Sequence, residues 1–328
     1  MKQLQRFKDE GFTVKCCYEA YYCGYNSQRT LSKNGFETDI IAPSSILRKT
    51  AKHAKTDRLD ARLLAEQHAN NMLQTVYIPT EEDEHDRSII RTRSFFVDQR
   101  KALKQHTLSL CRIFGLDFKA ETKAKEYWTK QHLTWLNLKL KTLKPEAKLN
   151  LEFLLMQYKQ YNEAIDLYNE KINTLASSEK YKKKVNALLC FKGVQTLTAM
   201  TFITELGDIK RFAHPNSITS YVGIDLREYS SGGKEKRYGI TKMGNKFLRT
   251  SAIESCQQMH IYRPVNKQLK ARREGQDPEL IEIAEKCRKR LYKRANHLLE
   301  AGKSSNKVKV AIAREFLGFI WAALNKVA

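Results

Sequence analysis

The sequence contains little proline and glycine for its length. Its 328 residues include 6 prolines and 14 glycines, whereas long disordered segments are usually rich in these residues. It contains no uninterrupted apolar run of about 18 residues, the length that a membrane-spanning helix requires, and no signal-peptide pattern. We therefore expect a folded, soluble, intracellular protein with no membrane partner and room for about two domains.

Cysteine is present in an odd number and without the spacing of a metal site. The seven cysteines are Cys16, Cys17, Cys23, Cys111, Cys190, Cys256 and Cys287. No two of them form a C-x-x-C pair, and a zinc site needs clustered ligands. The spacing therefore predicts reduced thiols, most of them buried, and no zinc.

Acidic residues are scarce relative to basic ones. The chain has 59 lysine and arginine residues against 36 aspartate and glutamate residues, a formal net charge of +23. The basic residues are spread along the chain rather than gathered in one tail. This excess favours a polyanionic partner, DNA or RNA, because cationic side chains neutralise phosphate.

The N-terminal region has the pattern of a strand, a helix and a second strand. Residues 12–17 are apolar and β-branched, which is typical of a short buried strand. A helix is predicted over Tyr25–Lys33 and a second strand over Thr38–Ala42. This order predicts a parallel βαβ unit. Glu19 follows the first strand, at the edge where the ligand sites of such sheets gather.

Two aspartates open the next predicted helix. Thr56 is a suitable N-cap, and Asp57 and Asp60 are three residues apart, so they lie on one face. Together with Glu19 they could hold one or two Mg²⁺ ions for phosphodiester chemistry. The alternative is that the aspartates only favour the helix N-terminus, where negative charge is stabilised by about 0.3–1 kcal/mol. Glu19 would then be a solvated strand-end residue.

Long helices are predicted for the middle of the chain, and a second compact region follows. Residues 81–185 have apolar residues at steps of three and four, which predicts a helical hairpin or coiled coil interrupted near Pro145. After residue 186, a turn at Gly193 opens a helix that ends near Gly207. The turn resembles half of a helix–hairpin–helix, in which backbone amides at a helix start bind a DNA phosphate.

The segment Tyr221–Asn245 combines serine, glycine and basic residues. Ser230 and Ser231 come directly before Gly232-Gly233, in a segment that we interpret as a loop. The basic residues that follow are Lys234, Lys236, Arg237 and Lys242. A serine among such cations could attack a phosphodiester. The alternative is a loop whose serines only contact phosphate, which is the commoner role of such serines.

Helices are predicted for most of the remaining C-terminal region. They cover residues 216–222, residues 245–260 and, in a basic terminal set, residues 278–325. On the last of them, an apolar stripe is formed by Val308, Ile312, Phe316, Phe319 and Ile320. Trp321, next to the stripe, is expected in the core.

Several short motifs are spread through the sequence in a fixed order. They are YEA (18–20), KTDRLDARLLA (55–65), ELGDIKRF (205–212), YVGI (221–224), SSGGK (230–234), GITKMGN (239–245) and AREFLGFIWA (313–322). Each is weak alone, but together they cover nearly the whole chain. With these motifs the sequence resembles the insertion sequence 110 family of transposases (IS110/IS1111 type).

The resemblance implies a fold of the α/β plus mostly α class. It places a partial RNase H-like (RuvC-like) domain in residues 1–80, a helical coiled-coil linker in residues 81–185 and a mainly helical transposase domain in residues 186–328. It also implies a bacterial or archaeal cytoplasmic protein, associated with the nucleoid, that acts on DNA as a homodimer or homotetramer. A structured guide RNA is the further partner that it implies.

The resemblance also implies the roles of site residues. Glu19, Asp57 and Asp60 match the glutamate and the paired aspartates of a D-E-D-D site for Mg²⁺. Ser231 matches the nucleophile, with Ser230 as the alternative. The implied activity is a DNA transposase that attacks a DNA phosphate with this serine.

One motif of the family is absent from this sequence. The family's first aspartate lies in an opening strand of the type G-I-D, and Asp9 is a poor substitute for it. Two further interpretations therefore stand beside an active recombinase. One is a truncated, catalytically inactive nucleic-acid-binding remnant of such a transposase. The other is a metal-dependent junction nuclease in which the serine is dispensable.

Overall fold

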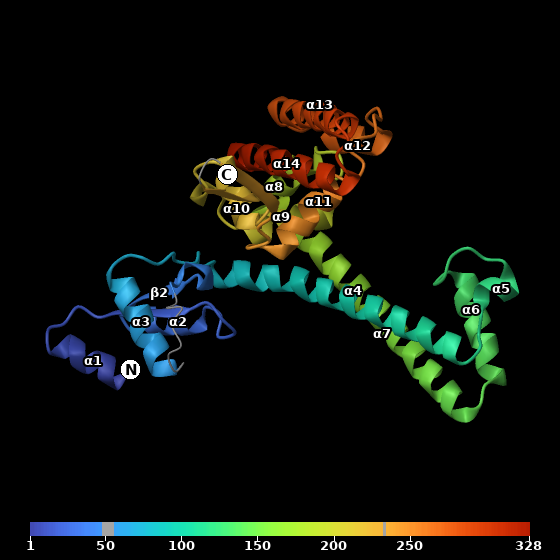
Figure 1. Cartoon of the computed structure of the whole chain (residues 1–328), viewed down its shortest axis with the longest axis horizontal. Helices are drawn as coiled ribbons and strands as arrows, with labels where there is room; N and C mark the ends of the chain where they lie inside the picture. The colour runs from blue at the N-terminus through green and yellow to red at the C-terminus, as the bar shows by residue number, and fades with distance from the viewer. Residues whose placement is uncertain (48–55, 232–233) are drawn as a thin grey trace. The chain divides into compact units, whose positions relative to one another are not determined.

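The chain folds into two compact units, unit 1 (Met1–Thr80) and unit 2 (Glu81–Ala328). The computed structural model describes residues 1–47, 56–231 and 234–328, and the side chains of residues 229–231 and 234–237 lie outside this description. Figure 1 colours the chain from its N-terminus to its C-terminus and labels the main elements.

Unit 1 is built around two short parallel strands. Its elements are α1 (Lys2–Asp9), β1 (Lys15–Glu19), α2 (Asn26–Lys33), β2 (Glu37–Ile41), the 3₁₀ turn η1 (Pro43–Ser45) and α3 (Asp57–Ala69). β1 pairs in parallel with β2, and Glu19 lies opposite Ile41. The predicted βαβ order is therefore confirmed.

The two strands of unit 1 differ in burial. β2 carries Ile40 and Ile41, which are 1% and 0% exposed. It has neighbours on both edges, because Val76 N donates to Ile40 O at 2.7 Å on the side away from β1. β1 has β2 as its one neighbour strand in the described part of unit 1, and its side chains are half-buried or exposed. The prediction of a strand over residues 12–17 is confirmed for residues 15–17 only, and its predicted burial is wrong, because the strand lies at a sheet edge.

α3 begins as the sequence predicts and is anchored at its far end. Thr56 caps the helix, its Oγ1 accepting from Leu59 N at 3.4 Å. Near the C-terminal end, the Gln67 side chain accepts from Leu47 N at 3.0 Å and donates to Leu47 O at 2.7 Å. The first turn of α3 is exposed, so packing fixes the end of the helix rather than its beginning.

Two long helices of unit 2 lie along each other. α4 (Glu81–Ile113) and α7 (Pro145–Ala176) run side by side in Figure 1, and Arg93 Nε donates to Asn169 Oδ1 at 2.6 Å across them. The predicted pair of long helices is present. Pro145 is in the first turn of α7, where its missing N–H is tolerated, so it begins the second helix.

The connection between these helices has its own small core. α5 (Phe118–Thr122), α6 (Lys130–Lys139) and the 3₁₀ turn η2 (Leu140–Thr142) pack their apolar side chains against the ends of α4 and α7. His132 is fully buried there. Burial lowers its pKa to about 4, and the charge of Lys104 acts in the same direction. His132 is therefore neutral at physiological pH, with Nδ1 accepting from Trp128 N at 3.1 Å.

The main core of unit 2 is helical and is centred on α9. The further elements are α8 (Glu179–Leu189), α9 (Thr196–Leu206), the 3₁₀ turn η3 (Ile209–Arg211), α10 (Pro215–Val222), β3 (Leu226–Ser231), β4 (Lys234–Ile240), α11 (Lys246–Ser255), α12 (Lys267–Arg273), α13 (Pro278–Glu300) and α14 (Ser305–Val327). Residues 199–206 of α9 are all buried. Ile90 of α4 and Ile172 of α7 belong to the same core, so the long helices and the C-terminal helices share one interior.

The last helix supplies much of this core. The predicted apolar stripe is confirmed, because Val308, Ile312, Phe316 and Ile320 of α14 are each 3% exposed or less, and each such buried side chain contributes about 1.5–3 kcal/mol. Trp321 packs against the core and donates from Nε1 to Phe212 O at 2.8 Å. Figure 1 shows α14 between α13 and the shorter helices of unit 2.

The structure tests the prediction of reduced, mostly buried cysteines. All seven thiols are free, and Cys111, Cys190, Cys256 and Cys287 are buried, as predicted. Burial raises the pKa of Cys256 and of Cys287 well above the ordinary value, which keeps both protonated and inert. Across the described residues, no helix combines the length and the apolar composition needed to cross a membrane.

Candidate active site

The two candidate serines end a β-strand. β3 (Leu226–Ser231) and β4 (Lys234–Ile240) form an antiparallel hairpin, in which Ser231 lies opposite Lys234 and Ser230 lies opposite Glu235. The interpretation of Ser230 and Ser231 as loop residues is therefore wrong, because both are paired in the ladder. Gly232-Gly233 lies outside the described residues, as do the side chains of Ser230, Ser231, Lys234, Lys236 and Arg237.

Backbone hydrogen bonds fix the base of this hairpin. Thr241 N donates to Asp225 O at 2.8 Å, and Lys242 N donates to Gly223 O at 3.0 Å. The next bond runs from Asn245 N to Tyr221 O at 2.9 Å. The YVGI and GITKMGN motifs thus lie against each other and hold the two ends of the hairpin together.

Two glycines make this close approach possible. A Cβ on Gly223 would lie 2.6 Å from Met243 O, and a Cβ on Gly244 would lie 2.4 Å from Tyr221 O. Both positions also have positive φ, +71° and +146°, which L-residues rarely adopt. Any side chain at either position would push the two motifs apart.

A buried carboxylate lies beneath the hairpin base. The Glu205 side chain is fully buried and receives two bonds from Arg91, from Nε at 2.7 Å and from Nη2 at 2.8 Å. Asn245 Nδ2 donates to the same carboxylate at 2.6 Å. The Asn245 side chain also caps α11, since its Oδ1 accepts from Leu248 N at 3.1 Å. The network joins α4, α9 and α11 at the point where the hairpin is anchored.

Sequence reasoning did not single out Arg91, Glu205 or Asn245 as individual residues. Glu205 interrupts an apolar run in α9, and a charge in such a run signals a buried partner. The partner, Arg91, is 114 residues away in the chain, so spacing does not reveal it. The ELGDIKRF motif has a further local role, because Asp208 Oδ1 accepts from Lys210 N at 2.9 Å and so begins η3.

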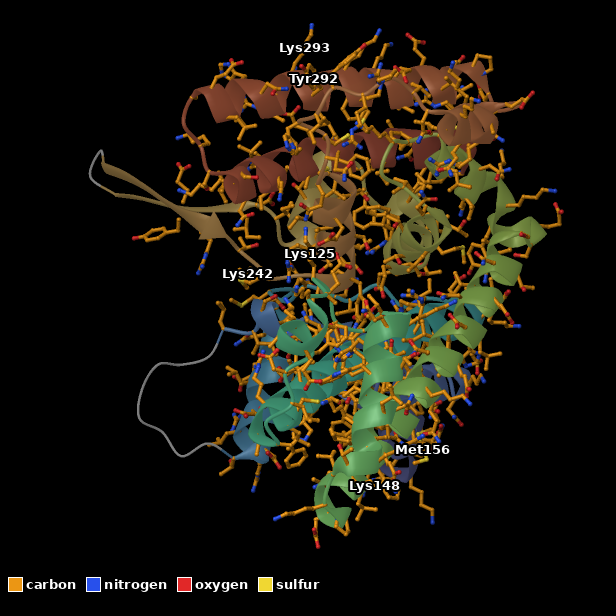
Figure 2. All side chains as sticks on the ribbon, turned by 90° about the vertical axis from the view of Figure 1, so that its right-hand side faces the viewer. Lys125, Lys148, Met156, Lys242, Tyr292 and Lys293 are labelled. Atoms are coloured by element: carbon orange, nitrogen blue, oxygen red, sulfur yellow. The ribbon has the colours of Figure 1, made fainter. Side chains whose placement is uncertain are left out.

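Lys242 is the one predicted phosphate contact of the hairpin region whose side chain is described. It is exposed and has φ +56°, in the left-handed region. Figure 2 labels Lys242 next to the hairpin. The bond from its amide to Gly223 O holds this conformation, so its ammonium group is carried on the fixed base rather than on the tip.

Gly193, the predicted phosphate contact of the C-terminal region, lies in the turn between α8 and α9. It has φ +84°, and a Cβ there would lie 2.3 Å from Ser255 O. The predicted turn and the helix that follows it are present, and α9 ends at Leu206, directly before Gly207. The glycine is required by the close approach of the α11 end and is itself exposed.

The three carboxylates predicted for metal binding all lie in unit 1. Glu19 is the half-buried last residue of β1, and Asp57 and Asp60 are exposed in the first turn of α3. In the described ranges no group of three or more His, Cys, Asp or Glu side chains is arranged to hold a metal ion. The assignment of Glu19, Asp57 and Asp60 as Mg²⁺ ligands stays a prediction.

The sequence is similar to a transposase family model and to several proteins named as transposases. A sequence model of the Transposase IS116/IS110/IS902 family matches residues 185–271. The protein y4qE of Sinorhizobium fredii, named as a transposase, is 33% identical over 310 residues, which cover 94% of this chain and 75% of that protein. The transposase for insertion sequence element IS1533 of Leptospira borgpetersenii is 31% identical over 315 residues, 90% of this chain and 85% of that protein. The transposase for element IS1111A of Coxiella burnetii is 28% identical over 265 residues, with 79% and 71% covered.

Proposed function

Because the chain belongs to the IS116/IS110/IS902 family of transposases, we propose that it cuts and rejoins DNA with a serine of the β3–β4 hairpin as nucleophile. Ser231 is the proposed nucleophile and Ser230 the alternative. The proposal rests on the contacts that fix this hairpin to the rest of unit 2. Its base is fixed by backbone bonds, by Gly223 and Gly244 and by the buried Glu205 network, and the serines lie at its opposite end.

The proposed reaction is a transesterification. The Ser231 hydroxyl attacks a DNA phosphorus and loses its proton, and a P–Oγ bond forms as one P–O bond of the strand breaks. The departing DNA oxygen takes up a proton and becomes a free hydroxyl. Rejoining is the reverse step with the hydroxyl of another strand, so the number of phosphodiester bonds is conserved and no other reactant is needed.

Basic residues beside the serines support this chemistry. Lys234, Lys236 and Arg237 belong to β4, and Lys242 follows it. Cations placed where negative charge develops on a phosphate stabilise the transition state. A fixed hairpin base favours such an arrangement, since catalytic groups that are held in place lose little entropy during the reaction.

We also propose DNA and a structured guide RNA as partners, bound by a homo-oligomer. The net charge of +23 supports polyanionic partners, and membership of the family supports DNA in particular. Removal of RNA by ribonuclease before the assay is expected to abolish recombination and to leave the fold unchanged. Unchanged recombination after complete ribonuclease treatment would exclude the guide.

The residues proposed to bind a metal ion all lie in unit 1. Glu19, Asp57 and Asp60 are the proposed Mg²⁺ ligands, and a bound ion would act as a Lewis acid on phosphate oxygens. Among the residues that the structure describes, no group of three or more His, Cys, Asp or Glu side chains is arranged to hold a metal ion. The proposed reaction steps involve residues of unit 2.

A recombination assay with paired donor and target DNA and the cognate flanking RNA tests the function. Ser231→Ala is expected to lower the rate by at least about 10³-fold, as removal of a nucleophile does. Ser230→Ala is expected to retain most activity. The reverse result would assign the nucleophile to Ser230, and full activity of both variants would exclude serine chemistry in favour of a metal-dependent nuclease.

A second candidate is nucleic-acid binding without catalysis. It is favoured by one observation: among the described residues, no group of three or more His, Cys, Asp or Glu side chains is arranged to hold a metal ion. In that case neither the unaltered protein nor either serine variant would recombine DNA, while all three would still bind it with equal affinity.

A further inference from the structure

A basic cavity lies in unit 2 beside the turn that precedes α9. Its volume is about 400 Å³, and it is lined by residues of that turn, of the end of α11 and the loop after it, of α12 and of α13. The cationic residues in its wall are Lys192, Arg263, Arg272 and Arg288, and the carboxylate in its wall is Glu254. Cations therefore outnumber carboxylates four to one around this space.

The positive charge of Lys192 in the cavity wall is poorly compensated. Lys192 Nζ donates to Ile261 O at the long distance of 3.4 Å. Burial lowers the pKa of Lys192, and the charges of Arg263 and Arg288 lower it further. These positive groups therefore repel one another, and an anion in the cavity would relieve that repulsion.

Arg272 is held at the cavity with unused hydrogen-bonding capacity. Its Nη1 donates to Val194 O at 2.6 Å, which fixes the guanidinium against the turn. Its Nε is buried and has no hydrogen-bond partner in the described residues. Arg288 differs, because its Nη2 is paired with Glu285 at 2.9 Å. Lys192, Arg263 and Arg272 thus supply the excess charge.

The start of α9 adds an anion-binding element to the same wall. Gln195 is the N-cap residue and lines the cavity, and its side chain does not cap the helix. The free N–H groups at a helix start favour a negative charge. Gly193, also in the wall, is exposed.

An exposed aromatic ring lies next to the cavity in the chain. Tyr262 precedes Arg263 and is 64% exposed. Its ring packs edge to face against Tyr292 of α13, with centroids 5.4 Å apart, and Arg288 lies 5.8 Å from its centroid. Figure 2 labels Tyr292 on α13. The support from Tyr292 fixes the Tyr262 ring while much of it faces solvent.

We propose that this cavity binds a backbone phosphate of an unpaired nucleic-acid strand and that Tyr262 stacks on a neighbouring base. The combination of a cationic groove with an exposed aromatic ring is what single-strand binding uses. The proposal rests on the proposed function only in taking nucleic acid as the ligand. It adds a second site, since α11 separates Asn245, at the hairpin base, from Ser255, at the cavity, by about 15 Å at 1.5 Å per residue.

The test is fluorescence anisotropy of short labelled single strands of DNA and of RNA with the full chain. The variant Lys192→Gln/Arg263→Gln removes two cavity charges and few structural bonds. It is expected to bind about 10-fold to 100-fold more weakly than the unaltered protein, and the slope of log affinity against log salt is expected to fall by about 1.4, or about 0.7 for each lost contact. Thermal unfolding checks that the variant remains folded.

Lys293→Gln is the matched control for charge. Lys293 is exposed on α13, does not line the cavity and is labelled in Figure 2. It is expected to change the affinity less than about 2-fold, as for an exposed charge that makes no contact. Equal effects of Lys293→Gln and of one cavity substitution alone, such as Lys192→Gln, would overturn the proposal, because only the overall charge would then matter.

Tyr262→Leu tests the stacking part independently of charge. It is expected to weaken binding about 10-fold, while Tyr262→Phe, which keeps the ring, binds as the unaltered protein does. Equal affinity of Tyr262→Leu and Tyr262→Phe would overturn the stacking role. If the variants bind both single-stranded DNA and single-stranded RNA more weakly, the site recognises the phosphates and bases that the two share. If they bind only one of the two more weakly, the site is specific for that nucleic acid.

This binding assay is separable from the test of the serine chemistry. It measures no cleavage and is repeated with Ser231→Ala, which is expected to bind as tightly as the unaltered protein. Loss of catalysis with retained binding would therefore indicate that the hairpin acts in the reaction. Loss of binding in the cavity variants would indicate that the cavity binds nucleic acid.

Discussion

The β3–β4 hairpin and the start of α3 both carry residues proposed for catalysis, and the two regions are supported differently. At the hairpin base, Glu205 is fully buried and bonded to both Arg91 and Asn245. At the start of α3, Asp57 and Asp60 are exposed and belong to no cluster of three metal-ligating side chains in the described part of the chain. The hairpin base is thus fixed by contacts with a buried side chain, whereas the start of α3 is exposed to solvent.

The largest expected effect is on the buried ion pair. Arg91→Ala leaves the Glu205 carboxylate buried without its main cationic partner, which is expected to lower the free energy of unfolding by about 3–5 kcal/mol. Denaturant unfolding of the full chain measures this loss. The control is Lys286→Ala, whose partner Glu282 lies at 2.7 Å in an exposed pair and which is expected to cost less than about 1 kcal/mol. Similar losses in the two variants would contradict the buried network.

His132, a buried polar group in the small core near α5 and α6, allows the effect of burial on stability to be tested by changing the pH. His132 is fully buried and its pKa in the folded state is lowered to about 4, against about 6.5 in the unfolded chain. Below pH 6.5 the unfolded state binds the proton first, so stability is expected to fall by about 3 kcal/mol as the pH decreases from 6.5 to 4. Above pH 6.5 this contribution is constant.

His132→Phe is the control for this pH dependence. It removes the titrating group, so its stability is expected to fall less than that of the unaltered protein between pH 6.5 and pH 4. Thermal unfolding across this range measures the difference. Parallel curves for the two proteins would show that His132 is not held neutral.

Adding a methyl group at the hairpin base is the next largest change. Gly223→Ala is expected to lower the free energy of unfolding by about 1–3 kcal/mol, because its Cβ would lie 2.6 Å from Met243 O at φ +71°. It is also expected to lower recombination. Gly239→Ala, in β4, is the control, since a Cβ there meets nothing within 4 Å. Equal stability of the two variants would contradict a tightly fixed base.

The smallest expected effect on stability is at the start of α3. Asp60→Ala removes an exposed carboxylate near a helix N-terminus and is expected to cost less than about 1 kcal/mol. If Glu19, Asp57 and Asp60 bind Mg²⁺, the same change abolishes metal-dependent activity and weakens Mg²⁺ binding in calorimetric titration. Unchanged Mg²⁺ binding and full activity would exclude these residues as metal ligands.

Local sequence signals predicted the elements whose contacts are local. Thr56 as a cap, the interruption of the helical region near Pro145 and the stripe on α14 each show in residues a few positions apart. The strand at Ser230 and Ser231 was missed, because serine and glycine suggested a loop. The Gly-Gly pair between two short runs was nevertheless a hairpin signal.

The residues that anchor the candidate site could not be predicted in the same way. Glu205 depends on Arg91 from a distant helix, and Gly193 depends on the approach of Ser255. Both contacts arise only when α9 is packed among its neighbours. The cavity beside Gly193 is likewise lined by the turn between α8 and α9, the end of α11 with the loop after it, α12 and α13, which no spacing in the sequence brings together.

The most direct test of the central claim is mass spectrometry of the protein after reaction with DNA. The protein is denatured during recombination, digested with nuclease and protease, and searched for a nucleotide bound to a peptide. A phosphodiester link on the peptide that contains Ser231, absent in Ser231→Ala, is the predicted result. DNA cleavage with no nucleotide attached to either Ser231 or Ser230 would contradict it.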